Sequence, residues 1–328
     1  MSGINRYVTI DDNISSIRER YPEGLHFVVG DVHGEAETLY HLMNKIEFDH
    51  EKDHVFFVGD YNAGGSPKEL LEYISQYYQE NCTETGFHLI RGNHEWELFP
   101  SYPLYNLPDI IVYRSEWMNY FIAHAGMVSS AFLLINEDME KEPAKQTFAY
   151  KLDPACAVQD APLRQIIWSR RGLYSQKSRW QNWPRTEELF KYRACIIHGH
   201  TPYCFFINDP LGYGDYSLFW ENQKIWFSED LCSFDIDSNV KGRMEGDEMY
   251  QGLSCLCLEI LEEISAENNG YLTIDGIRNA PNFVFSVPLD WQHHDVTKGN
   301  IDRVLNASPD MKIIRMDENG QLFITEKE

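Results

Sequence analysis

Residues 25–34, LHFVVGDVHG, decide the fold class of this chain. They begin as an apolar run rich in β-branched and aromatic side chains and end abruptly in glycine, aspartate and histidine. The same plan returns at residues 54–65, HVFFVGDYNAGG. A short apolar run bounded by turn residues predicts a buried strand. Residues 39–46 lie between the two runs with apolar side chains at helical spacing, so strand, helix and strand alternate and predict an α/β sheet.

The next helix has a clear start signal. Ser66 can serve as its N-cap, Pro67 as its first position and Glu69 as its capping-box partner. Further apolar or alternating runs predict strands at FHLI (87–90), NYFIA (119–123), ACII (194–197) and LSCLCLEI (253–260). The tail offers the short strand candidates YLTI (271–274), FVFSV (283–287), KIIRM (312–316) and LFIT (322–325). We therefore predict a catalytic domain at residues 24–264 and a β-rich C-terminal extension at residues 265–328, packed on it.

Polar residues follow the early strands directly, at the point where each strand ends. The stretches are GDVHG (30–34), GDYNAGG (59–65), GNHE (92–95), HAG (124–126) and GHTP (199–202). Ligands of open α/β sheets bind outside the carboxyl ends of the strands, so these side chains should converge on one crevice. A single Gly-Asp pair after a strand is ordinarily a turn, but five such coincidences predict a site. The candidate metal ligands are Asp31, His33, Asp60, Asn93, His124 and His200.

These five stretches resemble the calcineurin-like metallophosphoesterases. Within them they resemble the phosphoprotein-phosphatase superfamily, which includes bacterial serine/threonine phosphatases and symmetrical diadenosine-tetraphosphate hydrolases. The resemblance covers roughly residues 24–260, in the family's order and approximate spacing. It implies a four-layer αββα fold, a β-sandwich flanked by helices, with a binuclear metal centre at the strand ends.

The resemblance also implies which residue binds which ion. Asp31 and His33 would hold the first metal, and Asp60 would bridge both. The second metal would be held by Asn93, His124 and His200. Carboxylate, amide and imidazole ligands without a thiolate suit manganese, which we expect first, with iron or zinc as alternatives. His198 precedes the motif's Gly-His pair, and we interpret it as structural.

The resemblance further implies a metal-activated water that attacks phosphorus in line, with two cations stabilising the phosphoryl charge. His94 matches the family's general acid and would protonate the leaving alkoxide. Arg170, in WSRR (168–171), matches a phosphate-binding arginine, and Arg91 is a second candidate for substrate binding or a structural residue. The second motif departs from the family, because Ala63 and Gly64 stand where protein phosphatases have aspartate and arginine.

Because of these departures, the sequence indicates the class of reaction more directly than it indicates the substrate. We predict a phosphomonoesterase of the serine/threonine protein phosphatase type. The alternative is a hydrolase of dinucleoside polyphosphates, since Ala63 and the HAG stretch resemble the diadenosine-tetraphosphate hydrolases. An alternative of another class is an inactive phosphatase fold that serves as a binding module. The intact set of ligand positions argues against this last reading.

Composition bounds the partners and the compartment. The formal net charge is −23, which repels nucleic-acid backbones and anionic lipids, so we expect neither a nucleic-acid polymer nor a membrane as partner. A phosphorylated small molecule, nucleotide or phosphopeptide is expected instead, with bound cations inverting the local field. The chain shows no long apolar run, no secretory signal and no CxxC pair among its 7 cysteines, and we predict a cytoplasmic protein.

Two further features are interpreted as structural. The aromatic-rich segment 203–230 could line the substrate cleft, but we favour packing against the C-terminal tail. The pair His293–His294 is interpreted as two surface residues, because adjacent side chains in a strand or turn point apart.

Overall fold

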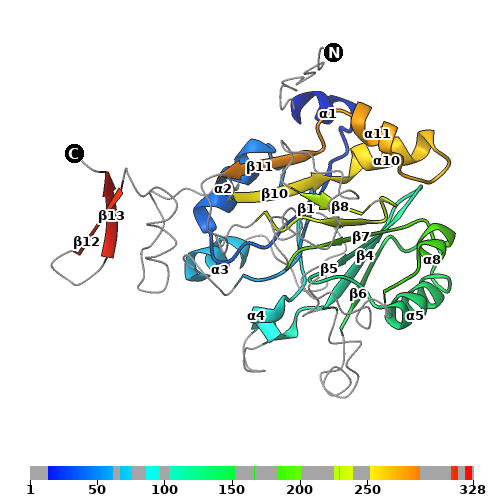
Figure 1. The fold of residues 1–328 in the computed structure, drawn as a ribbon, viewed down its shortest axis with the longest axis horizontal. Helices are drawn as coiled ribbons and strands as arrows, with labels where there is room; N and C mark the ends of the chain where they lie inside the picture. Colours follow the sequence, from blue (N-terminus) through cyan, green and yellow to red (C-terminus); the bar gives the residue numbers. More distant parts are fainter. Residues whose placement is uncertain are drawn as a thin grey trace, which may run out of the picture.

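Two facing β-sheets form the centre of the computed structural model (Figure 1). The order of strands is β11-β10-β1-β2-β3 in the first sheet and β6-β4-β5-β7-β9-β8 in the second. A further pair, β12-β13, stands in a sheet of its own. The structure describes residues 14–61, 67–75, 86–96, 103–151, 166, 183–200, 225–228, 230–238, 252–288, 312–316 and 322–326.

The first sheet contains the strands predicted from the opening motifs. Strands β1 (His26–Val29), β2 (His54–Phe57) and β3 (Gly86–Leu89) are parallel, with Phe27 opposite Val55 and Val55 opposite Phe87. On the other side of β1 lie two antiparallel neighbours, β10 (Gly252–Cys257) and β11 (Val284–Pro288). Because β1, β2 and β3 run in the same direction, their carboxyl ends lie at one edge of the sheet.

The second sheet supplies two more strand ends to the same region. Its central strands β5 (Asn119–Ala123) and β7 (Ala194–His198) are parallel, and β9 (Ser233–Asp235) continues parallel to β7. The remaining strands are β4 (Ile110–Arg114), β6 (Thr147–Tyr150) and β8 (Trp226–Phe227). The two sheets face each other, since Tyr113 of β4 stacks on His26 of β1 with 4.4 Å between ring centroids.

Helices cover the outer faces of both sheets. The bounds are α1 (Ile14–Arg20), α2 (Ala36–Lys45), α3 (Pro67–Ser75), α4 (Asn93–Trp96), α5 (Ser129–Met139), α8 (Thr186–Lys191), α10 (Leu258–Glu267), α11 (Ile274–Asn279) and the 3₁₀ helix η1 (Pro103–Asn106). One apolar cluster includes both sheets with α1, α2, α3 and α10. A second cluster packs α5 and α8 against the second sheet. The predicted four-layer αββα architecture is therefore confirmed.

The C-terminal part of the chain differs from the expectation. Helix α10 runs through residue 264, where the domain boundary was expected, and β11 then joins the first sheet. The strand expected at 271–274 is wrong, because residues 271–273 are irregular and Ile274 begins α11. Thr273 caps this helix by accepting the N–H of Gly276 at 3.1 Å. We propose that the catalytic body extends at least to residue 288.

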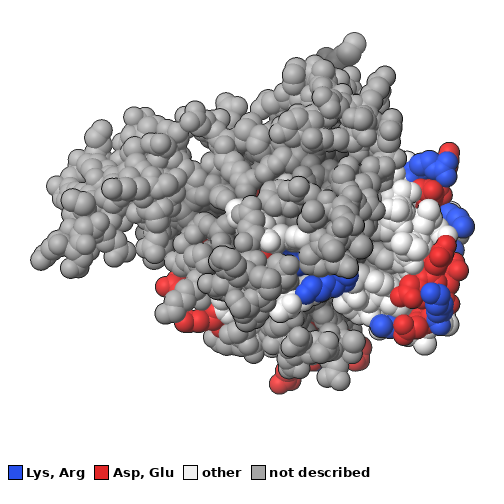
Figure 2. Space-filling model, turned by 90° about the horizontal axis from the view of Figure 1, so that it is seen from below, with Lys and Arg blue, Asp and Glu red and all other residues white. Residues whose placement is uncertain are grey.

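Two of the expected tail strands are confirmed beyond that point. Strands β12 (Lys312–Met316) and β13 (Leu322–Glu326) pair antiparallel with each other. None of the helices in the described ranges is long and apolar enough to cross a bilayer. Acidic and basic side chains lie beside one another at the edge of the molecule that carries α5 and α8, seen at the right of Figure 2. At and just after the C-terminal end of α5, Lys141 pairs with Asp138 and Lys145 pairs with Glu142.

Candidate metal centre

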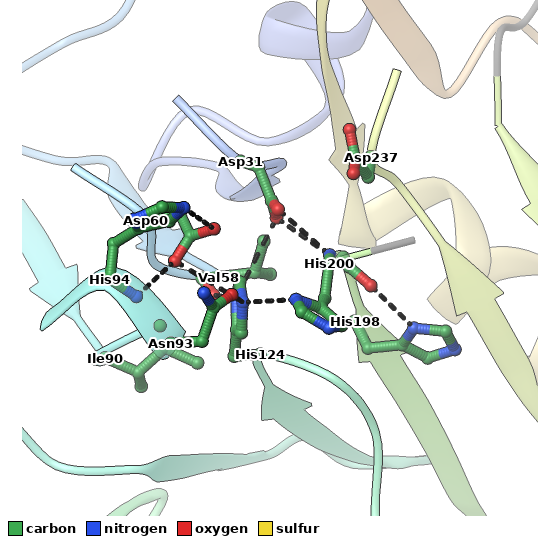
Figure 3. Close-up of polar contacts among 12 residues, drawn as sticks. Asp31, Val58, Asp60, Ile90, Asn93, His94, His124, His198, His200 and Asp237 are labelled. Carbon is green, nitrogen blue, oxygen red and sulfur yellow. Dashed lines mark hydrogen bonds and ion pairs between the residues drawn. The ribbon is translucent and has the colours of Figure 1, made fainter. Parts of the chain in front are cut away.

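The candidate ligands lie on five turns, each directly after a strand. Asp31 and His33 follow β1, Asp60 follows β2 and Asn93 follows β3. His124 follows β5, and His200 follows β7 in the opposite sheet. All are buried, with at most 6% of any residue exposed. Figure 3 shows side chains from both sheets pointing toward one another at this seam.

Asp60 is shared by two groups of possible donor atoms. Its carboxylate forms one group with His33 and His94 and another with His124 and His200, and within each group the donor atoms lie within 4.8 Å of one another. Oδ2 of Asp60 is 3.7 Å from Nε2 of His33, and Oδ1 is 3.5 Å from Nε2 of His124. A carboxylate whose two oxygens face two donor sets has the geometry that a bridging ligand needs.

The remaining candidates complete these two sets. Nε2 of His124 lies 3.0 Å from Oδ1 of Asn93 and 3.1 Å from Nδ1 of His200. Oδ2 of Asp31 lies 3.8 Å from Nε2 of His33, and its carboxylate accepts the backbone N–H of His200. Nδ1 of His124 is held by the carbonyl of Val58 at 2.7 Å, which fixes the ring with Nε2 toward the site.

Three of the candidate ligands have left-handed backbones. The φ angles are +49° at His33, +61° at Asp60 and +69° at His200. This conformation costs of order 1–3 kcal/mol for a residue other than glycine and is concentrated at functional sites. The turns therefore place these side chains at a cost in conformational energy that the rest of the fold offsets.

The site also concentrates buried negative charge. Burial raises the pKa of the Asp31 carboxyl well above its ordinary value, and the carboxylates of Asp237, Asp60 and Asp235 raise it further. Bound cations would stabilise carboxylates buried at such density, because like charges in a poorly solvated site destabilise one another. The oxygen and nitrogen donors, their spacing and this charge all fit divalent metal ions.

Two further aspartates near the site, Asp235 and Asp237, lie outside the five sequence motifs. Asp235 is the last residue of β9, Asp237 follows two residues later, and both are buried. The backbone N–H of Asp237 donates to Asp235 at 3.0 Å. Strand β9 is only three residues long and Phe234 is its one apolar residue, so no apolar run in the sequence marks these two aspartates.

His94 lies at the rim of the group. Its side chain is 24% exposed, against 1% for Asp60, and its Nε2 is 3.9 Å from Oδ2 of Asp60. Its ring meets that of His33 edge to face at 5.6 Å. Distance alone would allow His94 to bind a metal, but its exposure also leaves it accessible to a substrate.

More than half of the chain matches a known sequence family. The model of the calcineurin-like phosphoesterases matches residues 27–204, which is 178 of the 328 residues. The chain belongs to the calcineurin-like phosphoesterases. No curated protein matches it significantly.

Solved structures resemble this calcineurin-like phosphoesterase more distantly. A candidate diadenosine tetraphosphatase is 16% identical, with a TM-score of 0.40, over 81% of this chain and 94% of the other. A serine/threonine phosphatase from Saccharomyces cerevisiae, with similarity to human phosphatase PP5, is 14% identical with a TM-score of 0.39, over 73% and 74%. A predicted phosphoesterase from Streptococcus pneumoniae TIGR4 is 12% identical with a TM-score of 0.28, over 71% and 81%. The family membership rests on the sequence match.

Arg91 has a structural environment in this phosphoesterase. Its side chain is fully buried and forms an ion pair with Asp109, with Nη2 2.9 Å from Oδ2. The guanidinium also lies 4.1 Å from the ring centroid of Trp96, whose indole N–H donates to Asp109 at 2.9 Å. These contacts favour the structural role that the sequence left open over the expected role in substrate binding.

Several expectations fall outside the described residues. They concern Arg170 with its WSRR stretch, Ala63 and Gly64, the proposed cap Ser66, His293 and His294, and residues 203–224 of the aromatic-rich segment. His198 is described, and its ring points away from His124 (Figure 3). It is buried, with Nε2 3.2 Å from the hydroxyl of Ser233 and Nδ1 3.6 Å from Asp235, as expected of a structural histidine.

A cavity of about 450 Å³ lies beside the second sheet, near His198. It is lined by residues 183–187, Leu189, Ser228, Asp230 and Ser233. Trp183 joins this cavity to the turn after β5, because a side chain at Gly126 would overlap its indole ring. Gly126 has a φ of +119°, so the glycine of the HAG stretch both permits this backbone and leaves room for the indole.

Proposed function

We propose that this phosphoesterase is a phosphomonoesterase that depends on two divalent cations and resembles serine/threonine protein phosphatases. The observation that carries the proposal is Asp60, whose carboxylate belongs to both groups of donor atoms. In our assignment Asp31 and His33 hold the first cation, Asn93, His124 and His200 hold the second, and Asp60 bridges them. Manganese is the cation we propose, with iron or zinc as alternatives.

The protein's own groups then have separate tasks. Two bound cations would supply an activated water nucleophile and neutralise the phosphoryl oxygens. The carbonyl of Val58 fixes the ring of His124 through Nδ1. The carboxylate of Asp31 accepts the backbone N–H of His200 and so holds the turn that carries it. His94 is proposed to hold a proton at Nε2 and to donate it to the leaving oxygen, and its partial exposure supports this role. Arg170 remains the proposed phosphate-binding arginine.

The overall charge makes the cations a requirement for substrate binding. A phosphate ester is anionic, whereas the chain carries a net charge of −23 and buries several carboxylates at the site, among them those of Asp31, Asp60, Asp235 and Asp237. Only a local positive charge can make this region attractive to a phosphate. We therefore propose phosphorylated small molecules, nucleotides or phosphopeptides as substrates, in the cytoplasm.

A panel of substrates tests the proposal. Manganese-loaded protein is compared on a phosphopeptide, p-nitrophenyl phosphate, bis-p-nitrophenyl phosphate and diadenosine tetraphosphate. We expect turnover of the two monoesters to exceed that of the diester and the dinucleotide by at least about tenfold, since a monoester leaves more phosphoryl oxygens free for the cations. Absence of turnover on all four, with two manganese ions bound, would instead support the inactive binding module.

The cavity beside Trp183 favours one second candidate, a hydrolase of dinucleoside polyphosphates. A half-buried indole offers a flat apolar face on which a nucleobase can stack. The carboxylate of Asp230 also lies in the wall of this cavity, where it accepts hydrogen bonds from the hydroxyls of Ser228 and Thr186. Under this candidate diadenosine tetraphosphate is the preferred substrate, and Trp183→Leu lowers its kcat/KM while leaving that of p-nitrophenyl phosphate unchanged.

A further inference from the structure

Glu95 lies buried between the two turns that carry Asp60 and Asn93. It is 0% exposed, and its carboxylate accepts three backbone N–H groups. Oε2 accepts those of Asp60 and Gly92, both at 2.8 Å, and Oε1 accepts that of Tyr61 at 2.9 Å. Two of the donors belong to the turn after β2 and one to the turn after β3, so a single side chain joins the two turns.

Three charge-assisted hydrogen bonds make this a strong link. A carboxylate away from water is costly unless donors surround it, and hydrogen bonds to an ionised acceptor are roughly twice as strong as neutral ones. The bonds to Asp60 and Tyr61 also hold two consecutive amides in one orientation. Since Asp60 has a left-handed φ of +61°, its backbone needs such outside support to remain there.

Asp60 in turn connects the other parts of the site. Its carbonyl accepts the N–H of His33 at 2.7 Å, and its Oδ1 accepts the N–H of His94 at 3.1 Å. A Cβ at Gly92 would overlap the Asp60 carboxylate, so the two turns are already in close contact. Any shift of the Asp60 backbone would therefore be transmitted to His33, on the first donor group, and to His94.

We infer that Glu95 is a positioning residue, which holds the backbone of Asp60 so that its two carboxylate oxygens face both donor groups at once. This inference rests on the proposed metal-dependent function and adds a residue that acts through Asp60 rather than on the substrate. It makes the affinity for the cations depend on a side chain that contacts neither cation nor substrate. Outer-shell partners of this kind typically change metal affinity or activity by 10–100-fold.

Glu95→Gln tests the inference with Asp53→Asn as its matched control. Both residues are 0% exposed carboxylates that accept backbone N–H groups at turns flanking β2. Asp53 lies at the opposite end of that strand and accepts the N–H groups of Leu25 and Asp49, both at 2.8 Å, with Arg18 as its ion-pair partner. Each substitution replaces one acceptor oxygen by an NH₂ group and lowers stability. Only the substitution at Glu95 should also weaken the binding of the cations.

The measurement is the binding of Mn²⁺ to the metal-free proteins by titration calorimetry, with thermal unfolding and steady-state kinetics beside it. We expect Glu95→Gln to weaken Mn²⁺ binding by 10–100-fold and to lower kcat more than it raises KM. Asp53→Asn should lose comparable stability and bind Mn²⁺ as the wild type does. If Glu95→Gln does not fold, Glu95→Asp keeps the charge, withdraws the oxygens by one methylene and should weaken Mn²⁺ binding in the same direction.

Two other outcomes are informative in different ways. Wild-type affinity for Mn²⁺ in the folded Glu95 variant, or an equal loss of affinity in Asp53→Asn, would overturn the positioning role and leave Glu95 as a stabilising residue only. Failure of the wild-type protein itself to bind Mn²⁺ would overturn the proposed function as well as this inference. The wild-type titration therefore separates the two failures.

Discussion

At the scale of single residues, Asp60 combines a left-handed backbone with a carboxylate that faces two donor groups. Asp60→Asn tests its role with little change of shape, because asparagine tolerates the left-handed region nearly as well as aspartate. We expect activity to fall at least about 100-fold, since a bridging ligand loses its charge, while the fold survives. Turnover of p-nitrophenyl phosphate and circular dichroism measure the two effects. Retained activity would mean that another residue bridges the cations.

Gly126 permits a second prediction at this scale. With a φ of +119° and the Trp183 ring where a Cβ would lie, Gly126→Ala should lower the free energy of unfolding by about 1–3 kcal/mol through backbone strain, and more if the indole cannot move. Denaturant unfolding measures the change. Trp183→Ala on top of Gly126→Ala should recover the steric part alone. A stability equal to that of wild type in Gly126→Ala would contradict this account of the turn.

At the scale of elements, a stack of histidines crosses the three parallel strands of the first sheet. His26 of β1 and His54 of β2 stack at 4.6 Å, and His54 stacks on His88 of β3 at 5.2 Å. Nδ1 of His54 lies 2.9 Å from Nε2 of His88, and Glu259 of α10 lies 2.7 Å from Nδ1 of His26. Burial, helped by the neighbouring histidines, lowers the pKa of His54 to about 4 and that of His88 to about 3.

This stack predicts a loss of stability in acid. A histidine whose folded pKa lies below its unfolded value of 6.5 is neutral in the fold but takes up a proton on unfolding. Its contribution is therefore complete above about pH 6.5 and is lost as the pH falls toward 4 and 3. His88→Phe should reduce the slope of the unfolding free energy against pH in this window by up to roughly 1.4 kcal/mol per pH unit. Denaturant unfolding at several pH values measures the slope.

The control for this prediction is a histidine with the opposite environment. His41 on α2 has a side chain that is 50% exposed and pairs with Glu37 on the same helix. His41→Gln, which removes an exposed imidazole, is measured in the same way for comparison. An unchanged slope in His88→Phe would mean that the acid lability arises elsewhere, for example from the carboxylates and histidines of the metal centre.

At the scale of the whole molecule, the candidate metal centre lies at the seam between the two sheets, with Asp31 and Asp60 from one and His124 and His200 from the other. Cations bound there connect both sheets and should raise the stability of the entire fold. At a free concentration 100 times the dissociation constant, each bound cation adds about 2.7 kcal/mol, which for a chain of this length is roughly 4–5 °C in Tm. Scanning calorimetry of chelator-stripped protein with and without Mn²⁺ checks this. A Tm that does not respond to Mn²⁺ would contradict a cation site at the seam.

The sequence by itself determined the strands β1, β2, β3, β5 and β7 and the polar residues at their ends, because apolar runs and the turns that bound them are local signals. It also led to the family, through motifs that are contiguous in the chain. It placed His198 with the structural residues, in agreement with its contacts to Ser233 and Asp235.

Only the tertiary structure decided which partners the buried charges have. Arg91 follows a strand as the candidate ligands do, yet it turns to Asp109, which a distant turn brings beside it. Glu95 stands next to His94 in the chain, but the role that we propose for it depends on the contact between the turns of β2 and β3. The pattern of residues 271–274 predicts a strand, but these residues lead into helix α11. The strand that completes the first sheet beside β10 is β11. The physical reason is the same in each case. A local pattern reports periodicity and residue type, whereas the partner of a buried charge or an edge strand is set by which elements become neighbours when the sheets close.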